Sequence, residues 1–195
     1  MKKLAVMLVC FVLLCAGAST QEIDYADYKS IRADALKGDP NAQYNMGVLY
    51  ERGQIVRQDY KEALKWYRKA AEQGYPLAQN NLALMYDNGR GVKQDYKEAV
   101  KWYRKAADQD LAMAQYNLAL MYDEGHGVKQ DYKEAAKWYK KAAVQGQPQA
   151  EYNLGYMYLN GQGVFKDYDE AVKWLKLSAE HGHETAAALL NELGE

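Results

Sequence analysis

Four tryptophans recur at a spacing of 36 residues, at Trp66, Trp102, Trp138 and Trp174. Most positions of residues 75–110 are repeated in residues 111–146. The same register carries Gly53, Gly89, Gly125, Gly161, Asp59, Asp95, Asp131 and Asp167. Self-similarity with a fixed period of this length indicates a stack of small units, each of which buries its apolar side chains against its neighbours. We therefore expect a solenoid rather than a domain with one closed core.

The sequence pattern predicts two helices in each unit. In the second unit the first helix covers residues 78–86. Ala78, Leu82 and Met85 fall on one face of this helix, as the helical period requires. Gly89 follows as a natural C-terminal cap.

The second helix of the unit begins after Asp95, with Glu98 three residues further on. This spacing predicts a capping box, in which both side chains accept hydrogen bonds from backbone amides of the first turn. The predicted buried stripe of the helix comprises Ala99, Trp102, Tyr103, Ala106 and Ala107. A glycine ends this helix in three copies, and Asp110, which tolerates the left-handed conformation better than most residues, stands in the other.

The repeats divide the chain into a predicted signal peptide (1–18), an N-terminal half-repeat that forms a capping helix (19–38), four repeats (39–74, 75–110, 111–146 and 147–182) and a C-terminal capping half-repeat (183–195). Two positions carry residues that differ from the repeat pattern. Ile55 stands where later repeats have glycine, which predicts a different loop. Leu175 replaces the tyrosine of earlier repeats, and we expect it to contact the C-terminal cap.

The third repeat carries the most regular motif, with Ala114-Gln115-Tyr116-Asn117-Leu118-Ala119-Leu120-Met121-Tyr122, then Gly125-His126-Gly127-Val128, and later Trp138-Tyr139. This motif resembles the Sel1-like repeat family, a relative of the tetratricopeptide repeats. The resemblance implies an all-α fold, a right-handed α-solenoid of helix-turn-helix repeats. It also implies an adaptor whose partner is chosen by surface residues, since the fold alone does not fix a function.

The first residues have the layout of a secretory leader. Lys2 and Lys3 precede an apolar run at 4–15 and a small, polar stretch at 16–20, with cleavage expected after Ala18. The run is too short to span a bilayer, so we expect export to the periplasm or the exterior. Removing residues 1–18 leaves 23 basic (25 less 2) and 26 acidic residues, a formal charge of −3. This balance argues against nucleic-acid binding.

The mature chain offers little for catalysis, so we predict neither an enzyme nor a cofactor. Its few hydroxyls include Ser178 and Thr185, which stand near His181 and His183. The two histidines are a fragment of a metal site without a third ligand, and we predict no metal. The Gly-x-Gly turns lack the context of a phosphate loop. The alternative function is an accessory factor or weak hydrolase acting on cell-wall material.

Partner-binding residues are predicted on the first helices, which the resemblance places on the inner curve of the solenoid. In register these helices offer Tyr44, Val48 and Glu51, then Asn80, Leu84 and Asp87, then Tyr116, Leu120 and Asp123, then Tyr152, Tyr156 and Leu159. Their aromatic and apolar content favours a groove for a protein or peptide. The structural alternative is that some of these rings pack between adjacent first helices.

A row of asparagines recurs in the middle of the first helices, where asparagine is a poor helix former. The row comprises Asn45, Asn81, Asn117 and Asn153. Two explanations stay open: a ladder of side-chain bonds between neighbouring helices, or capture of the backbone of an extended peptide.

Lysines recur on the second helices, and the simplest explanation is a solvated outer face. Attraction to a membrane surface or an anionic envelope polymer is the alternative. We expect a monomer.

Overall fold

The computed structural model describes residues 25–195, and the predicted signal peptide lies outside them. This part of the chain forms helices joined by turns. The helices are α1 (Tyr25–Leu36), α2 (Pro40–Arg52), α3 (Tyr60–Glu72), α4 (Pro76–Asn88), α5 (Tyr96–Ala107), α6 (Ala112–Glu124), α7 (Tyr132–Val144), α8 (Pro148–Asn160), α9 (Tyr168–Glu180) and α10 (Glu184–Leu193). The first helices of the four repeats are α2, α4, α6 and α8, and the second helices are α3, α5, α7 and α9.

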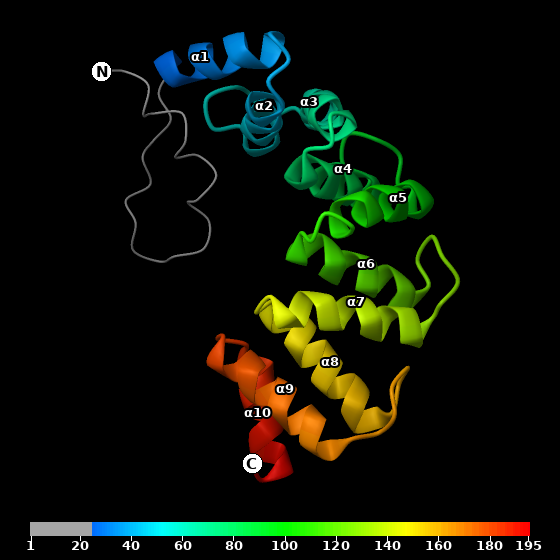
Figure 1. Ribbon diagram of the computed structural model, residues 1–195. Helices are drawn as coiled ribbons and strands as arrows, with labels where there is room; N and C mark the ends of the chain where they lie inside the picture. The colour runs from blue at the N-terminus through cyan, green and yellow to red at the C-terminus, as the bar shows by residue number, and fades with distance from the viewer. Residues whose placement is uncertain (1–24) are drawn as a thin grey trace.

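Consecutive helices pack against one another along the whole described chain. Figure 1 shows that the helix pairs are stacked along an arc from α1 to α10. The predicted all-α solenoid is therefore confirmed, and each repeat is stabilised by its nearest neighbours. None of the described helices is both long enough and apolar enough to cross a bilayer.

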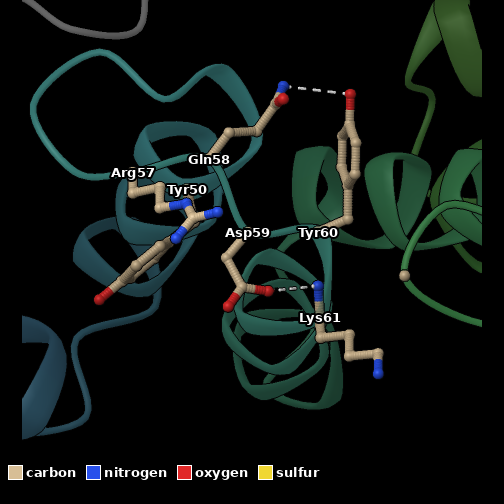
Figure 2. A pocket seen from close by; sticks show the side chains of 7 residues that line it. Tyr50, Arg57, Gln58, Asp59, Tyr60 and Lys61 are labelled. Atoms are coloured by element: carbon tan, nitrogen blue, oxygen red, sulfur yellow. Dashed lines mark hydrogen bonds between the residues drawn. The ribbon is translucent and has the colours of Figure 1, made fainter.

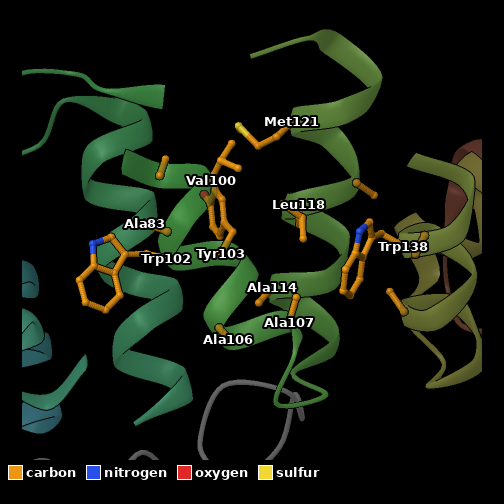
Figure 3. Packing of buried hydrophobic residues seen from close by; sticks show 14 of the residues in the cluster. Ala83, Val100, Trp102, Tyr103, Ala106, Ala107, Ala114, Leu118, Met121 and Trp138 are labelled. Carbon is orange, nitrogen blue, oxygen red and sulfur yellow. The ribbon is translucent and has the colours of Figure 1, made fainter. Parts of the chain in front are cut away.

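Aromatic side chains of the second helices fill the interior. The four repeated tryptophans are at most 9% exposed, and Tyr67, Tyr103 and Tyr139 are fully enclosed. Figure 3 shows Tyr103 on the side of α5 that faces Leu118 of α6, within one continuous cluster. Burying an apolar side chain of this size contributes roughly 1.5–3 kcal/mol relative to leaving it exposed. The predicted buried stripe is confirmed.

The aspartate that precedes each second helix caps it as predicted, but the glutamate does not complete the capping box. Asp95 accepts a bond from the backbone N–H of Glu98 at 3.0 Å. The N–H of Asp95 donates to the Tyr86 carbonyl (2.9 Å), so it does not need the glutamate. The Glu98 carboxylate instead accepts from Nε1 of Trp102 at 3.0 Å. In repeats 2–4 the glutamate therefore satisfies the indole of a buried tryptophan, a partner that the capping motif alone did not indicate. Nε1 of Trp66 in repeat 1 is buried without a hydrogen-bond partner among the described residues.

Two kinds of turn require unusual backbone conformations. Asp110 has φ 60°, in the place that glycine takes in the other copies, as predicted. Gly127 has φ 71°, and a Cβ at this position would overlap the backbone of Tyr96 in the preceding repeat. Gly91 and Gly163 lie equally close to the preceding repeat. The second glycine of each Gly-x-Gly turn thus allows neighbouring repeats to approach closely.

The two ends of the stack are covered by the capping helices. Ile55 and Tyr28 both pack against an apolar cluster that includes Ile31 of α1. At the other end, Leu175 joins Ala186 and Leu190 of α10. Leu175 therefore lies in the apolar cluster that includes the C-terminal cap, as expected.

Candidate partner-binding surface

The predicted partner-binding residues lie on α2, α4, α6 and α8. We call this surface, together with Glu51, Asp87 and Asp123, the first-helix face. Tyr156 is its most open member, at 46% exposure. Asn45 is 3% exposed and Asn80 is 1% exposed, so neither is available to a partner. The other predicted residues are half-buried: Tyr44, Val48, Asn81, Leu84, Tyr116, Asn117, Leu120, Tyr152 and Asn153.

The tyrosines of this face rest against the second helices or the turns that follow them. The Tyr44 ring lies 5.8 Å from that of Tyr67 and 5.4 Å from that of Tyr75. The Tyr116 ring lies 5.9 Å from that of Tyr139. These contacts fix the rings and leave part of each at the surface, which gives a rigid floor of aromatic side chains.

Three of the four repeated asparagines reach a neighbouring helix, whereas Asn45 donates to Oδ1 of Asn41 in its own helix at 2.9 Å. Nδ2 of Asn117 donates to Oδ1 of Asn80, which links α6 to α4 at 3.0 Å. Asn81 interacts with the Tyr67 hydroxyl, and Asn153 does so with that of Tyr139. These are the contacts that the structural explanation of the row requires. Capture of a peptide backbone by the same residues stays a prediction.

Three carboxylates of the first-helix face are held by enclosed tyrosines. The Tyr67 hydroxyl donates to Glu51 at 2.6 Å. The two following repeats have the same bond at 3.1 Å, between Tyr103 and Asp87 and between Tyr139 and Asp123. Sequence reasoning placed the acids on this face but missed the tyrosines. The available signal was the fourth repeat, in which Leu159 and Leu175 replace both partners together.

Burial sets the protonation behaviour of these pairs. It raises the pKa of the Asp87 carboxyl, an effect that the Tyr103 hydroxyl and His126 oppose. It also raises the pKa of the Asp123 carboxyl against the opposing effect of the Tyr139 hydroxyl. The pKa of each of the three tyrosines is raised, first by burial and then by the carboxylate beside it. The hydroxyls therefore stay protonated and act as donors, and the carboxylates remain only partly solvated.

A second set of polar pairs joins the first turn of each first helix to a residue that follows the second helix of the same repeat. Glutamine amides bond at 2.7–2.8 Å in repeats 1–3, between Gln73 and Gln43, Gln109 and Gln79, and Gln145 and Gln115. In the fourth repeat, Nδ1 of His181 lies 2.9 and 3.0 Å from the two carboxylate oxygens of Glu151, whose side chain is 1% exposed. Both glutamines of the earlier repeats are therefore replaced together in the fourth repeat. This paired replacement is visible in the sequence but was missed.

The hydroxyl and histidine side chains near the C-terminus have separate partners. The Ser178 hydroxyl donates to the Pro148 carbonyl at 2.7 Å, whereas His181 faces Glu151. His183 accepts from the N–H of Ala186 at the start of α10 (3.3 Å). These side chains are therefore engaged in structural contacts at the end of the stack.

A surface pocket opens at the turn between α2 and α3, and Figure 2 shows the side chains that line it. Gln58 donates to the Tyr60 hydroxyl at 3.1 Å, and Asp59 accepts from the N–H of Lys61 at 2.9 Å. The same glutamine–tyrosine bond recurs at Gln94 and at Gln130. The polar groups of this pocket thus belong to a turn that repeats 1–3 share, whereas the fourth repeat has Lys166 in place of the glutamine.

The lysines of the second helices cover the tryptophans. Nζ of Lys69, Lys105 and Lys141 lies 4.4, 3.9 and 4.2 Å from the centre of the tryptophan ring three residues earlier. Each stem shields an aromatic ring while its charge stays in solvent.

These features define a helical-repeat solenoid with an acidic and aromatic face on its first helices. The Sel1 repeat profile matches residues 40–75, 76–111, 112–147 and 148–183. The chain therefore belongs to the Sel1 repeat family. No curated protein matches it.

Solved structures agree with this assignment. The chain is similar to c5321, a protective antigen of uropathogenic Escherichia coli with an SLR fold (41% identity, TM-score 0.83, covering 85% of this chain and 36% of that one). It also resembles a Sel1 repeat protein from Oxalobacter formigenes (39%, TM-score 0.78, 86% and 48%). Cysteine-rich protein B of Helicobacter pylori is more distant (28%, TM-score 0.54, 70% and 98%). The chain spans about a third to a half of the first two.

Proposed function

We propose that this protein is an exported, monomeric adaptor that binds a protein or peptide along the first-helix face and performs no catalytic step. Sel1 repeat proteins are generally scaffolds for protein interaction. The observation that carries the proposal is the rigid aromatic floor on the first helices, where Tyr44 and Tyr116 are held by buried tyrosines of the second helices. Fixed aromatic side chains with partly exposed rings are efficient interface anchors, because little side-chain entropy is lost on binding.

Site-specific photo-cross-linking in the native host tests this proposal. A benzophenone amino acid replaces Tyr116 or Tyr156, which are aromatic already, and Lys97 or Lys133 on the second helices serves as the control. We expect a discrete cross-linked product from the first two positions only. Equal products from all four positions, or none from the first two in a correctly folded protein, would contradict the adaptor proposal.

Export is tested separately by N-terminal sequencing of the protein recovered from host fractions. We expect Ser19 as the first residue, in material outside the cytoplasm. Recovery of the chain only inside the cell, with residues 1–18 retained, would contradict export and leave the binding proposal standing.

A further inference from the structure

Charge is segregated between the two helical faces. The described helices α2, α4, α6 and α8 together contain one basic residue, Arg52. The second helices of repeats 1–3 carry Lys61, Lys65, Arg68, Lys69, Lys97, Lys101, Arg104, Lys105, Lys133, Lys137, Lys140 and Lys141. Such a division gives the first-helix face a negative potential and repels acidic partners from it.

The acids on this face are fixed in place. Asp87 and Asp123 each accept one hydrogen bond from an enclosed tyrosine hydroxyl. A carboxylate has about four lone-pair sites, so each can accept further bonds from a partner. Because these carboxylates are half-buried and held by neutral donors, their charge is less screened than that of a mobile surface acid.

The chain itself supplies an example of a cation at such an acid. Nη1 of Arg90, in the turn after α4, lies 3.7 Å from Oε1 of Glu51. The residue in register with Arg90 is His126 in the next repeat and Gln162 in the one after. His126 lowers the pKa of Asp87, and Asp123 has no ion pair within residues 25–195. The chain's own cations thus neutralise the acid of this face less and less from repeat 1 to repeat 3.

The fourth repeat breaks the acidic row. Leu159 occupies the position of the acids and packs in the apolar cluster that includes Leu175. Tyr156, one turn earlier, is 46% exposed. The first-helix face therefore changes from acidic to apolar towards the C-terminus.

We propose that the occupant of the first-helix face is an extended peptide segment that places arginine or lysine side chains on Asp87 and Asp123 and an apolar side chain on Tyr156. The inference rests on the proposed adaptor function and specifies its partner. The negative charge of the face favours a cationic segment. Because the face becomes apolar at repeat 4, the apolar side chain of the peptide lies towards the C-terminal end of the solenoid. A guanidinium suits these carboxylates because it donates two parallel bonds.

Fluorescence anisotropy with labelled extended decapeptides tests this inference at about 0.15 M salt, where long-range attraction is screened. Three peptides share one terminal leucine and differ at two positions, which carry arginine, the neutral isostere citrulline, or glutamate. We expect the arginine peptide to bind at least about tenfold more tightly than the citrulline peptide. The glutamate peptide is expected to bind weakest.

The matched variants separate specific contact from bulk charge. Asp87→Asn with Asp123→Asn keeps acceptors for the tyrosine hydroxyls, and it should abolish the preference for arginine. Glu72→Gln with Glu180→Gln changes the net charge equally on exposed second-helix positions, and it should keep the preference. Thermal melts check that both variants fold.

Equal affinity for the arginine and citrulline peptides, or equal loss of preference in both variants, would overturn the cationic-partner inference. Binding of the glutamate peptide at the lysine-rich second helices would do the same. If the host cross-links at Tyr116 and Tyr156 persist in that case, the adaptor proposal stands with a different partner. If both experiments fail, the adaptor proposal itself falls.

Discussion

The first three repeats and the fourth use different side chains for the same two contacts between helices. Repeats 1–3 join first and second helices with paired glutamines and with a tyrosine hydroxyl on a carboxylate. The fourth repeat has His181 on Glu151 in place of the glutamines. It has Leu159 and Leu175 in place of the acid and tyrosine. Both members of each pair differ together.

This difference teaches that the pair, rather than the single residue, is the unit that the repeat preserves. An enclosed polar group without a partner costs free energy, so a position becomes apolar at least cost when the opposite position does so as well. The fourth repeat also lies against a capping helix instead of another full repeat, and terminal repeats are atypical for this reason. Leu159 with Leu175, and Glu151 with His181, are the two pairs that differ where the fourth repeat meets α10.

The largest expected effect comes from breaking the ionisable pair of the fourth repeat. His181→Ala leaves the Glu151 carboxylate enclosed without its partner, and we expect a loss of about 3 kcal/mol in the free energy of unfolding. Urea denaturation measures the loss, and hydrogen exchange should locate it in α8, α9 and α10.

Repeat 3 provides the matched control for this substitution. Gln145→Ala removes the neutral counterpart, and we expect a loss of only about 1 kcal/mol. His181→Gln with Glu151→Gln installs the pair of the earlier repeats and should recover most of the stability lost in His181→Ala. An equal cost for His181→Ala and Gln145→Ala would show that the two pairs do not differ in the way proposed.

The tyrosine–carboxylate pair is the next contact to break. Tyr139→Phe keeps the ring and removes the hydroxyl that bonds Asp123 and interacts with Asn153. We expect a loss of about 1.5 kcal/mol, because a hydrogen bond to a charged acceptor is worth more than one between neutral groups. Chemical denaturation measures it. Asp123→Asn retains an acceptor and should cost less; an unchanged stability in Tyr139→Phe would mean that the bond contributes nothing net.

A smaller effect is expected from the pH dependence of the same acids. Burial raises the pKa of Asp87 and Asp123, so the folded protein binds these protons more tightly than the unfolded chain does. Their favourable contribution is complete below the unfolded pKa and is lost as pH rises through the raised folded pKa. Relative to Asp87→Asn with Asp123→Asn, the wild type should therefore lose stability from acidic to neutral pH.

Melting temperatures measured across this pH range check the sign. Glu72→Gln with Glu180→Gln, which changes exposed acids, should follow the wild type. If the wild type instead gains stability relative to Asp87→Asn with Asp123→Asn as pH rises, burial does not raise the pKa of these two carboxyls.

Periodicity predicted the fold well because one apolar stripe, repeated with its caps, admits few arrangements. The burial of Trp102 and the cap at Asp95 follow from local rules. The bond from Tyr103 to Asp87 does not, since it joins positions on different helices and depends on how the helices are rotated against each other. The same reason explains why Glu98 was assigned to a backbone amide when its partner is an indole. In-register comparison of the fourth repeat could have revealed the pairs, but not their geometry.

The smallest expected effect concerns the outer face, where Lys141 covers the Trp138 ring at 4.2 Å and the fourth repeat has Leu177 instead. At an exposed site a cation–π contact is worth about 0.5–1 kcal/mol. Lys141→Leu removes that contact but keeps an apolar stem over the ring, so we expect a net change below about 0.5 kcal/mol in the free energy of unfolding. Lys141→Ala removes both and should cost more. If the two substitutions destabilise equally in urea titrations, the charge rather than the stem stabilises this contact, and the leucine of the fourth repeat then requires a different neighbour to compensate for it.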